Sequence, residues 1–218
     1  MLFRTSFALF TFFAGCGAVA AASGCGSTTD DANGGSQNGT DAGASIVDAA
    51  ADALSVEHPD ASCFVEIQEW PKLDSPHIGF GDSPTYNSNP PSSGPHYPVW
   101  AAFKDYTTAV DRRYYVHNME HGGVVLLYKC DKPEGCPDVA DAIKIARDGI
   151  TTDPLCDPAV RVRAVITPDP LLDTPVAAAA WGFTYKAACV DIPTLTAFAN
   201  AHQAKGPENL CANGQESF

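Results

Sequence analysis

The stretch with the most chemical potential is His-Asn-Met-Glu-His-Gly-Gly, residues 117–123. It places the imidazoles of His117 and His121 and the carboxylate of Glu120 within five residues. Proteins bind zinc and copper through these groups, and the same groups transfer protons near neutral pH. The stretch therefore indicates a metal site, a proton-transfer site or a hydrogen-bonded corner of the core.

A second segment, residues 86–96, ends in His96 and is rich in proline and glycine. Proline fixes φ and pushes the preceding residue toward extended geometry, so the segment predicts a stiff strap that delivers His96 to a fixed place. We expect His96, His117 and His121 to bind a transition metal, zinc or copper, with Glu120 as a ligand or as a partner of one. His77 is a candidate for a further ligand. A thioether close to the histidines would favour copper.

The sequence leaves two alternatives to simple metal binding. One is a surface-binding or structural module without a metal, whose long aromatic loop docks a partner. The other is a zinc-dependent hydrolase, because His117-x-x-Glu120-His121 matches an inverted zinc-protease motif with Glu120 as the catalytic base. That motif needs one face of a long helix, and the β-prone residues around it argue against one.

The elements that must position these groups follow from hydrophobic periodicity. Alternating or continuous apolar runs predict strands at residues 63–67, 113–117, 124–129, 160–165 and 176–188. Pro137–Asp148 predicts a helix with an apolar stripe, and Asp191 predicts the cap of a last helix. Residues 70–111 form a long proline-rich loop. The expected fold is a single α+β domain over residues 62–218, with a mostly antiparallel sheet and two helices.

Several motifs together resemble the bacterial family DUF3105, a domain of unknown function, between His77 and Cys211. They are the strap at residues 86–96, the Val-His-Asn-Met-Glu-His-Gly-Gly-Val-Val run at residues 116–125, Ala180-Trp181-Gly182 and Gly206-Pro207-Glu208. Met119 and Ser92 stand where Leu and Thr are usual in the family. The resemblance implies that the two histidine motifs matter, and it implies no reaction.

The amino terminus has the features of an export signal, with Arg4 followed by a short, glycine-broken apolar run. Residues 1–25 predict a signal peptide that ends at a lipobox-like Cys25, and Cys16 is the alternative lipidation site. Residues 26–61 are small, polar and acidic, which predicts a disordered tether. We therefore expect a lipid anchor in a bacterial membrane, facing the periplasm or the surface, with ordinary secretion as the alternative.

Cysteine content agrees with export. Six cysteines remain for the domain, and an even number in an oxidising compartment predicts disulfides: Cys63, Cys130, Cys136, Cys156, Cys189 and Cys211. Cys130–Cys136 is the best single pair, because it closes a short loop. The net charge of −13 argues against a nucleic-acid partner. The sequence indicates no particular protein partner.

Overall fold

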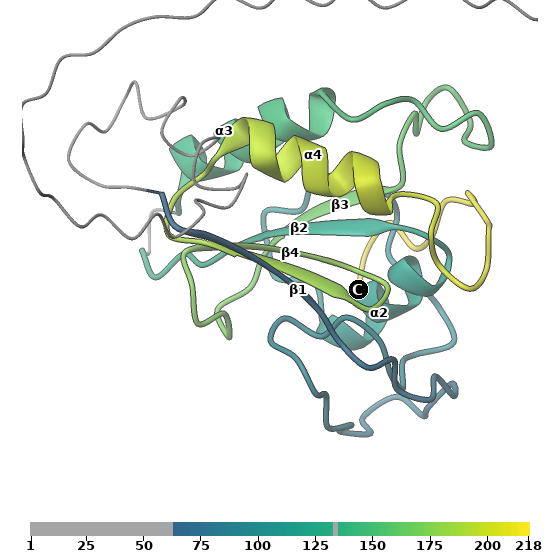
Figure 1. The fold of residues 1–218 in the computed structure, drawn as a ribbon. Coiled ribbons are helices and arrows are strands. Elements are labelled where there is room, and N and C mark those ends of the chain that lie inside the picture. The colour runs from purple at the N-terminus through teal and green to yellow at the C-terminus, as the bar shows by residue number, and fades with distance from the viewer. Residues whose placement is uncertain (1–62, 133–134) are drawn as a thin grey trace, which may run out of the picture. The chain divides into compact units, whose positions relative to one another are not determined.

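The computed structural model describes residues 63–132 and 135–218 as a five-stranded sheet flanked by helices (Figure 1). The predicted signal peptide, both candidate lipidation cysteines and the tether lie outside these residues. The elements, in chain order, are β1 (Val65–Glu69), α2 (Arg112–Glu120), β2 (Val124–Tyr128), α3 (Pro137–Asp148), β3 (Ala164–Pro168), β4 (Val176–Ala180), β5 (Phe183–Ala187) and α4 (Ile192–His202). The predicted α+β class is confirmed.

The sheet has the order β1-β5-β4-β2-β3. Only β2 and β3 run parallel, and α3 makes the crossover between them. The predicted strand at residues 176–188 is in fact the β4–β5 hairpin, which turns at Trp181 and Gly182. Gly182 has a φ of 80°, which glycine adopts at little steric cost.

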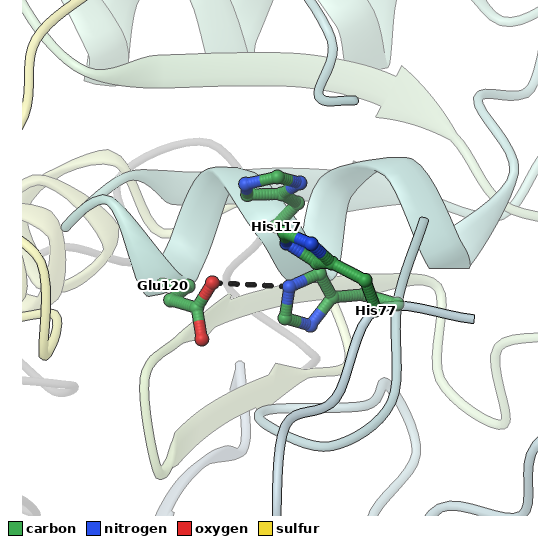
Figure 2. A group of neighbouring side chains, drawn as sticks. His77, His117 and Glu120 are labelled. Atoms are coloured by element: carbon green, nitrogen blue, oxygen red, sulfur yellow. Dashed lines mark ion pairs between the residues drawn. The ribbon is translucent and has the colours of Figure 1, made fainter. Parts of the chain in front are cut away.

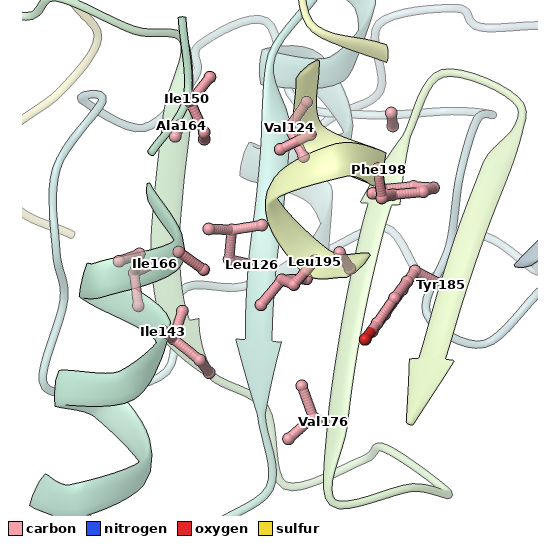
Figure 3. Close-up of a cluster of buried hydrophobic side chains, with 14 of the residues drawn as sticks. Val124, Leu126, Ile143, Ile150, Ala164, Ile166, Val176, Tyr185, Leu195 and Phe198 are labelled. Atoms are coloured by element: carbon pink, nitrogen blue, oxygen red, sulfur yellow. The ribbon is translucent and has the colours of Figure 1, made fainter. Parts of the chain in front are cut away.

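Helices α3 and α4 cover one face of the sheet (Figure 1). Alternate residues of β2, Val124 and Leu126, point toward them and pack with Ile143 of α3 and Leu195 of α4 (Figure 3). Both predicted helices are confirmed. Pro137 opens α3 and the Asp191 carboxylate caps α4 by accepting from the Thr194 amide at 3.1 Å.

Helix α2 covers the opposite face, and here the sequence prediction was wrong. Residues 113–117 were expected to form a strand but belong to this helix. The Asp111 side chain caps it by accepting from the Arg113 amide at 2.9 Å. Tyr115 and Met119 are fully buried against the sheet, so tertiary burial outweighs the β propensity of the Tyr-Tyr-Val run.

The two glycines after the histidine motif end this helix. The Gly123 amide donates to the Asn118 carbonyl at 2.7 Å, and the Gly122 amide donates to the Met119 carbonyl at 2.9 Å. With a φ of 81° at Gly122, this is a Schellman turn. The turn passes the chain directly from α2 into β2, so it fixes the end of the helix against the sheet.

The predicted strand at residues 160–165, with one solvent-facing side, was also wrong. Strand β3 begins only at Ala164 and is buried beside β2. Arg161 adopts a left-handed φ of 62°, and Arg163 is fully buried. The Arg163 guanidinium donates to the Asp153 carboxylate at 2.6 Å. Arg163 was expected on the solvent-facing side of a strand, but it forms an ion pair inside the protein.

Three disulfides lie within the described residues. Cys63–Cys189 and Cys156–Cys211 link segments that are distant in sequence, and Cys130–Cys136 closes a short loop. The predicted Cys130–Cys136 pair is among them. Cys63–Cys189 continues the antiparallel register of β1 and β5, in which Val65 faces Ala187. Within residues 63–132 and 135–218, no helix has the length and hydropathy to cross a bilayer.

Candidate metal centre

The strap at residues 86–96 delivers His96 to the end of α2. Ser93, inside the strap, accepts a hydrogen bond from the Leu73 amide at 3.0 Å. The Tyr86 hydroxyl donates to a carbonyl near the end of the strap at 2.8 Å. His96 is completely buried. Its burial and these two hydrogen bonds hold it in one place.

His77 reaches the same place through a short backbone pairing with the strap. The Ile78 amide donates to the His96 carbonyl at 2.9 Å, and the His96 amide donates to the Pro76 carbonyl at 3.2 Å. His77 is solvent-exposed. The centre therefore has a buried side on α2 and an open side at His77.

Helix α2 contributes His117 and Glu120, which lie three residues apart and so share one face of the helix. Met119 lies on the opposite face, buried in the apolar cluster against the sheet. Its thioether is therefore no candidate ligand beside the histidines. The indole of Trp100 packs against His117, with ring centroids 5.0 Å apart.

These side chains converge (Figure 2). One ligand atom from each of His77, His96, His117 and Glu120 lies within 4.8 Å of the others. The ring centroids of His77 and His117 are 5.0 Å apart, and those of His96 and His117 are 4.7 Å apart. Two segments and a helix that are distant in sequence thus bring three imidazoles and a carboxylate to one point.

Backbone carbonyls set the tautomers of the two buried histidines. Nδ1 of His96 lies 2.8 Å from the Gly94 carbonyl oxygen, and Nδ1 of His117 lies 2.7 Å from the Tyr97 carbonyl oxygen. A carbonyl only accepts, so each Nδ1 carries the hydrogen. In the neutral ring, Nε2 then holds a free lone pair, which is the arrangement of a metal-binding histidine.

One contact in the centre favours a bound cation. Nε2 of His96 lies 3.0 Å from a Glu120 carboxylate oxygen, the pair dashed in Figure 2, but without the alignment of a hydrogen bond. The other Glu120 oxygen accepts from the Ser75 hydroxyl at 2.9 Å. A lone pair on Nε2 and a carboxylate repel each other at this distance, and a cation bound by both atoms would remove that repulsion.

Burial keeps His117 neutral. Desolvation lowers its pKa from 6.5 to about 4, and the neighbouring rings of His96, His121 and His77 act in the same direction. The hydrogen bond to Tyr97 opposes this shift only in part. At neutral pH, the Nε2 lone pair of His117 is therefore available to a cation.

His121 belongs to a second group, with Glu120 and Glu208. Its Nε2 lies 3.1 Å from a Glu208 carboxylate oxygen, and its ring packs edge-on against Trp100. Desolvation lowers the pKa of His121, although Glu208 and Glu120 act to raise it. The expected set of His96, His117, His121 and Glu120 is thus divided between two groups that share Glu120.

The helical setting removes one objection to the inverted zinc-protease motif, since His117 and His121 do lie one turn apart at the end of α2. Their ring centroids are 4.5 Å apart. However, their ligand atoms fall in different groups, and Glu120 is itself a member of both groups. The hydrolase alternative stays a prediction without geometric support.

Glu208 was expected only as part of a family motif, and Ser75 was not predicted. The available signal for Glu208 was the Gly206-Pro207-Glu208 motif close to Cys211. In the structure, the Glu208 amide donates to the Glu120 carbonyl at 2.9 Å, which fixes this segment on the end of α2. No sequence signal marks Ser75.

Comparison with known proteins gives one match. The family description "Protein of unknown function (DUF3105)" matches residues 77–214. No curated protein and no solved structure matches the chain. The matched range contains all the histidines and carboxylates of both groups.

Proposed function

We propose that this chain, which belongs to the DUF3105 family, binds a divalent transition metal through His77, His96, His117 and Glu120. The observation that carries the proposal is the convergence of three imidazoles and a carboxylate on one point. A single proton between His96 and Glu120 would bridge that pair but would not engage His117 or His77. A metal ion satisfies all of them together.

Zinc is the first candidate for this set of three nitrogens and one oxygen, and Cu²⁺ is the competitor that imidazole ligands also favour. The burial of Met119 on the far face of α2 removes the thioether that would favour Cu⁺. Ligand atoms of a tetrahedral zinc site lie roughly 3.3 Å apart, so a group that spans up to 4.8 Å must contract. Exposed His77 is the ligand best able to move.

We further propose that the protein is exported and lipid-anchored through Cys25. The apolar amino-terminal run and the small residues before Cys25 support this, and the three disulfides fit an oxidising compartment. Mass spectrometry of the mature amino terminus tests it. A diacylglyceryl-modified Cys25 is the expected result, and an unmodified mature terminus or a modified Cys16 contradicts it.

The metal proposal is tested by elemental mass spectrometry of the full-length chain produced in an oxidising compartment. We expect at least one metal ion per chain after dialysis against zinc. His77→Ala removes an exposed ligand with little risk to folding, and we expect it to weaken zinc binding at least tenfold. His58→Ala, a histidine outside the described residues, is the matched control and leaves binding unchanged.

A folded wild-type protein without metal, after incubation with both zinc and copper, would overturn the proposal. Near-ultraviolet circular dichroism verifies folding in each variant. A zinc stoichiometry and affinity that stay equal to the wild type in both His77→Ala and His117→Gln would place the metal elsewhere.

A further inference from the structure

The segment at residues 206–211 carries a family motif that metal binding at the first group does not use. A Cβ atom built on Gly206 would lie 2.3 Å from the Glu120 carbonyl oxygen, so only glycine allows this approach to the end of α2. The Cys156–Cys211 disulfide holds the end of the segment. The backbone at Glu208 is therefore fixed, although its side chain is 60% exposed.

A buried arginine reinforces this placement. The Arg163 guanidinium donates to the His121 carbonyl at 2.7 Å and to the Asn209 side-chain oxygen at 2.6 Å. The same side chain thus positions both His121 and the residue next to Glu208. The backbone on both sides of the His121–Glu208 pair is therefore held by one fully buried guanidinium.

His121 is the imidazole of the second group. Its side chain is 3% exposed, and its Nε2 faces a Glu208 carboxylate oxygen at 3.1 Å. A cation bound at Nε2 would leave the ring hydrogen on Nδ1, which is the tautomer of a histidine ligand that binds through Nε2. The neighbouring groups within ligand distance are the carboxylates of Glu120 and Glu208.

We propose that His121, Glu208 and Glu120 bind a second divalent cation, and that the Glu120 carboxylate bridges it to the first. This inference rests on the proposed function, because the first cation occupies the group of His77, His96, His117 and Glu120. A carboxylate has two oxygens and can bind one cation through each.

The two sites differ in chemistry. The first offers three imidazoles and one carboxylate, whereas the second offers one imidazole and two carboxylates. Carboxylate-rich sites suit zinc, manganese and iron, and the exposed Glu208 side leaves positions for water. The second site is therefore the more weakly binding and more readily exchanged of the pair.

Zinc titration of the full-length, disulfide-bonded chain by isothermal calorimetry tests the inference. We expect two equivalents for the wild type, one for Glu208→Gln and one for His77→Ala. Glu66→Gln removes the same charge from an exposed position on β1 and keeps two equivalents. Glu120→Gln weakens both binding events at least tenfold, because both cations lose a ligand.

The outcomes separate the two proposals. One equivalent in the wild type, unchanged in Glu208→Gln and weakened in His77→Ala, overturns the second site and leaves the proposed function standing. One equivalent that Glu208→Gln removes and His77→Ala retains overturns both. No zinc binding by the folded wild type also overturns both. Two equivalents with only one weakened by Glu120→Gln overturns the bridge.

Discussion

The two faces of the sheet are built on different principles. The face under α3 and α4 is packed by aliphatic and aromatic side chains. The face under α2 also buries polar groups at and around the centre: Ser92, Ser93, His96, His117, Asn118, Glu120, His121 and Arg163. An apolar core tolerates substitutions of similar volume, but each buried polar group needs its own partner. The structure of the α2 face therefore depends on individual polar contacts.

Asn118 illustrates this specification. Its side-chain amide donates to the Ala101 carbonyl at 2.7 Å, and its side-chain oxygen accepts from the Ala101 amide at 3.0 Å. One side chain thus satisfies both backbone groups of a buried loop residue. The loop that carries Trp100 is thereby held against α2 and the histidines.

The largest loss of unfolding free energy is expected from Arg163→Met on the α2 face. This change leaves the Asp153 carboxylate buried without its partner, which costs about 3–5 kcal/mol of unfolding free energy. Urea denaturation measures the loss. Lys132→Met removes an exposed positive charge and serves as the control. A loss no greater than in the control would show that the polar contacts of this face are not individually required.

A somewhat smaller loss of unfolding free energy is expected from Leu126→Ala on the opposite face. Leu126 is fully buried between the sheet and the two helices, so its truncation costs about 2–5 kcal/mol through lost burial and a cavity. The exposed Ile145→Ala on α3 should change the unfolding free energy little.

The Leu126→Ala variant also tests whether the two faces are independent. Zinc stoichiometry of folded Leu126→Ala should equal that of the wild type, because the centre lies on the other side of the sheet. A changed stoichiometry would show that the faces are not independent.

The smallest effect is a pH dependence of the metal-free protein. Burial lowers the pKa of His117 from 6.5 to about 4, so the unfolded chain takes up a proton before the folded chain does. The stabilisation is complete above about pH 6.5 and is lost as the pH falls toward 4. Allowing for partial solvent screening, we expect a loss of about 1–2 kcal/mol.

Urea denaturation at pH 7 and pH 4.5 in the presence of a chelator checks this dependence. His117→Gln should show a smaller difference between the two pH values than the wild type. An equal difference would assign the acid sensitivity to other groups, such as His202 on the apolar face, whose pKa burial also lowers.

The apolar face was the more predictable from sequence. Pro137, the Ile143 stripe and Gly149 mark α3 by local signals alone, and the helix has the predicted bounds. The α2 face was less predictable, because the Tyr-Tyr-Val run has strand propensity and becomes helical through burial. Asp111 and the Gly122-Gly123 pair were local signals of its two ends, and they were not recognised.

The candidate centre was predictable in its motifs but not in its grouping. The imidazoles of His96 and His117 were expected to meet, and they do. Which group receives His77 and which receives His121 depends on a backbone pairing at Ile78 and on the direction of each ring at the end of α2. Neither is encoded in sequence spacing.

The Cys63–Cys189 disulfide has a mechanical consequence. Strand β1 is an edge strand that is paired only with β5, and Ile67 on it is half-exposed. A pulling force on the chain ahead of Cys63 would otherwise unzip β1 one hydrogen bond at a time. The disulfide joins the start of β1 covalently to the segment between β5 and α4, so the load passes into the body of the domain and bypasses the strand.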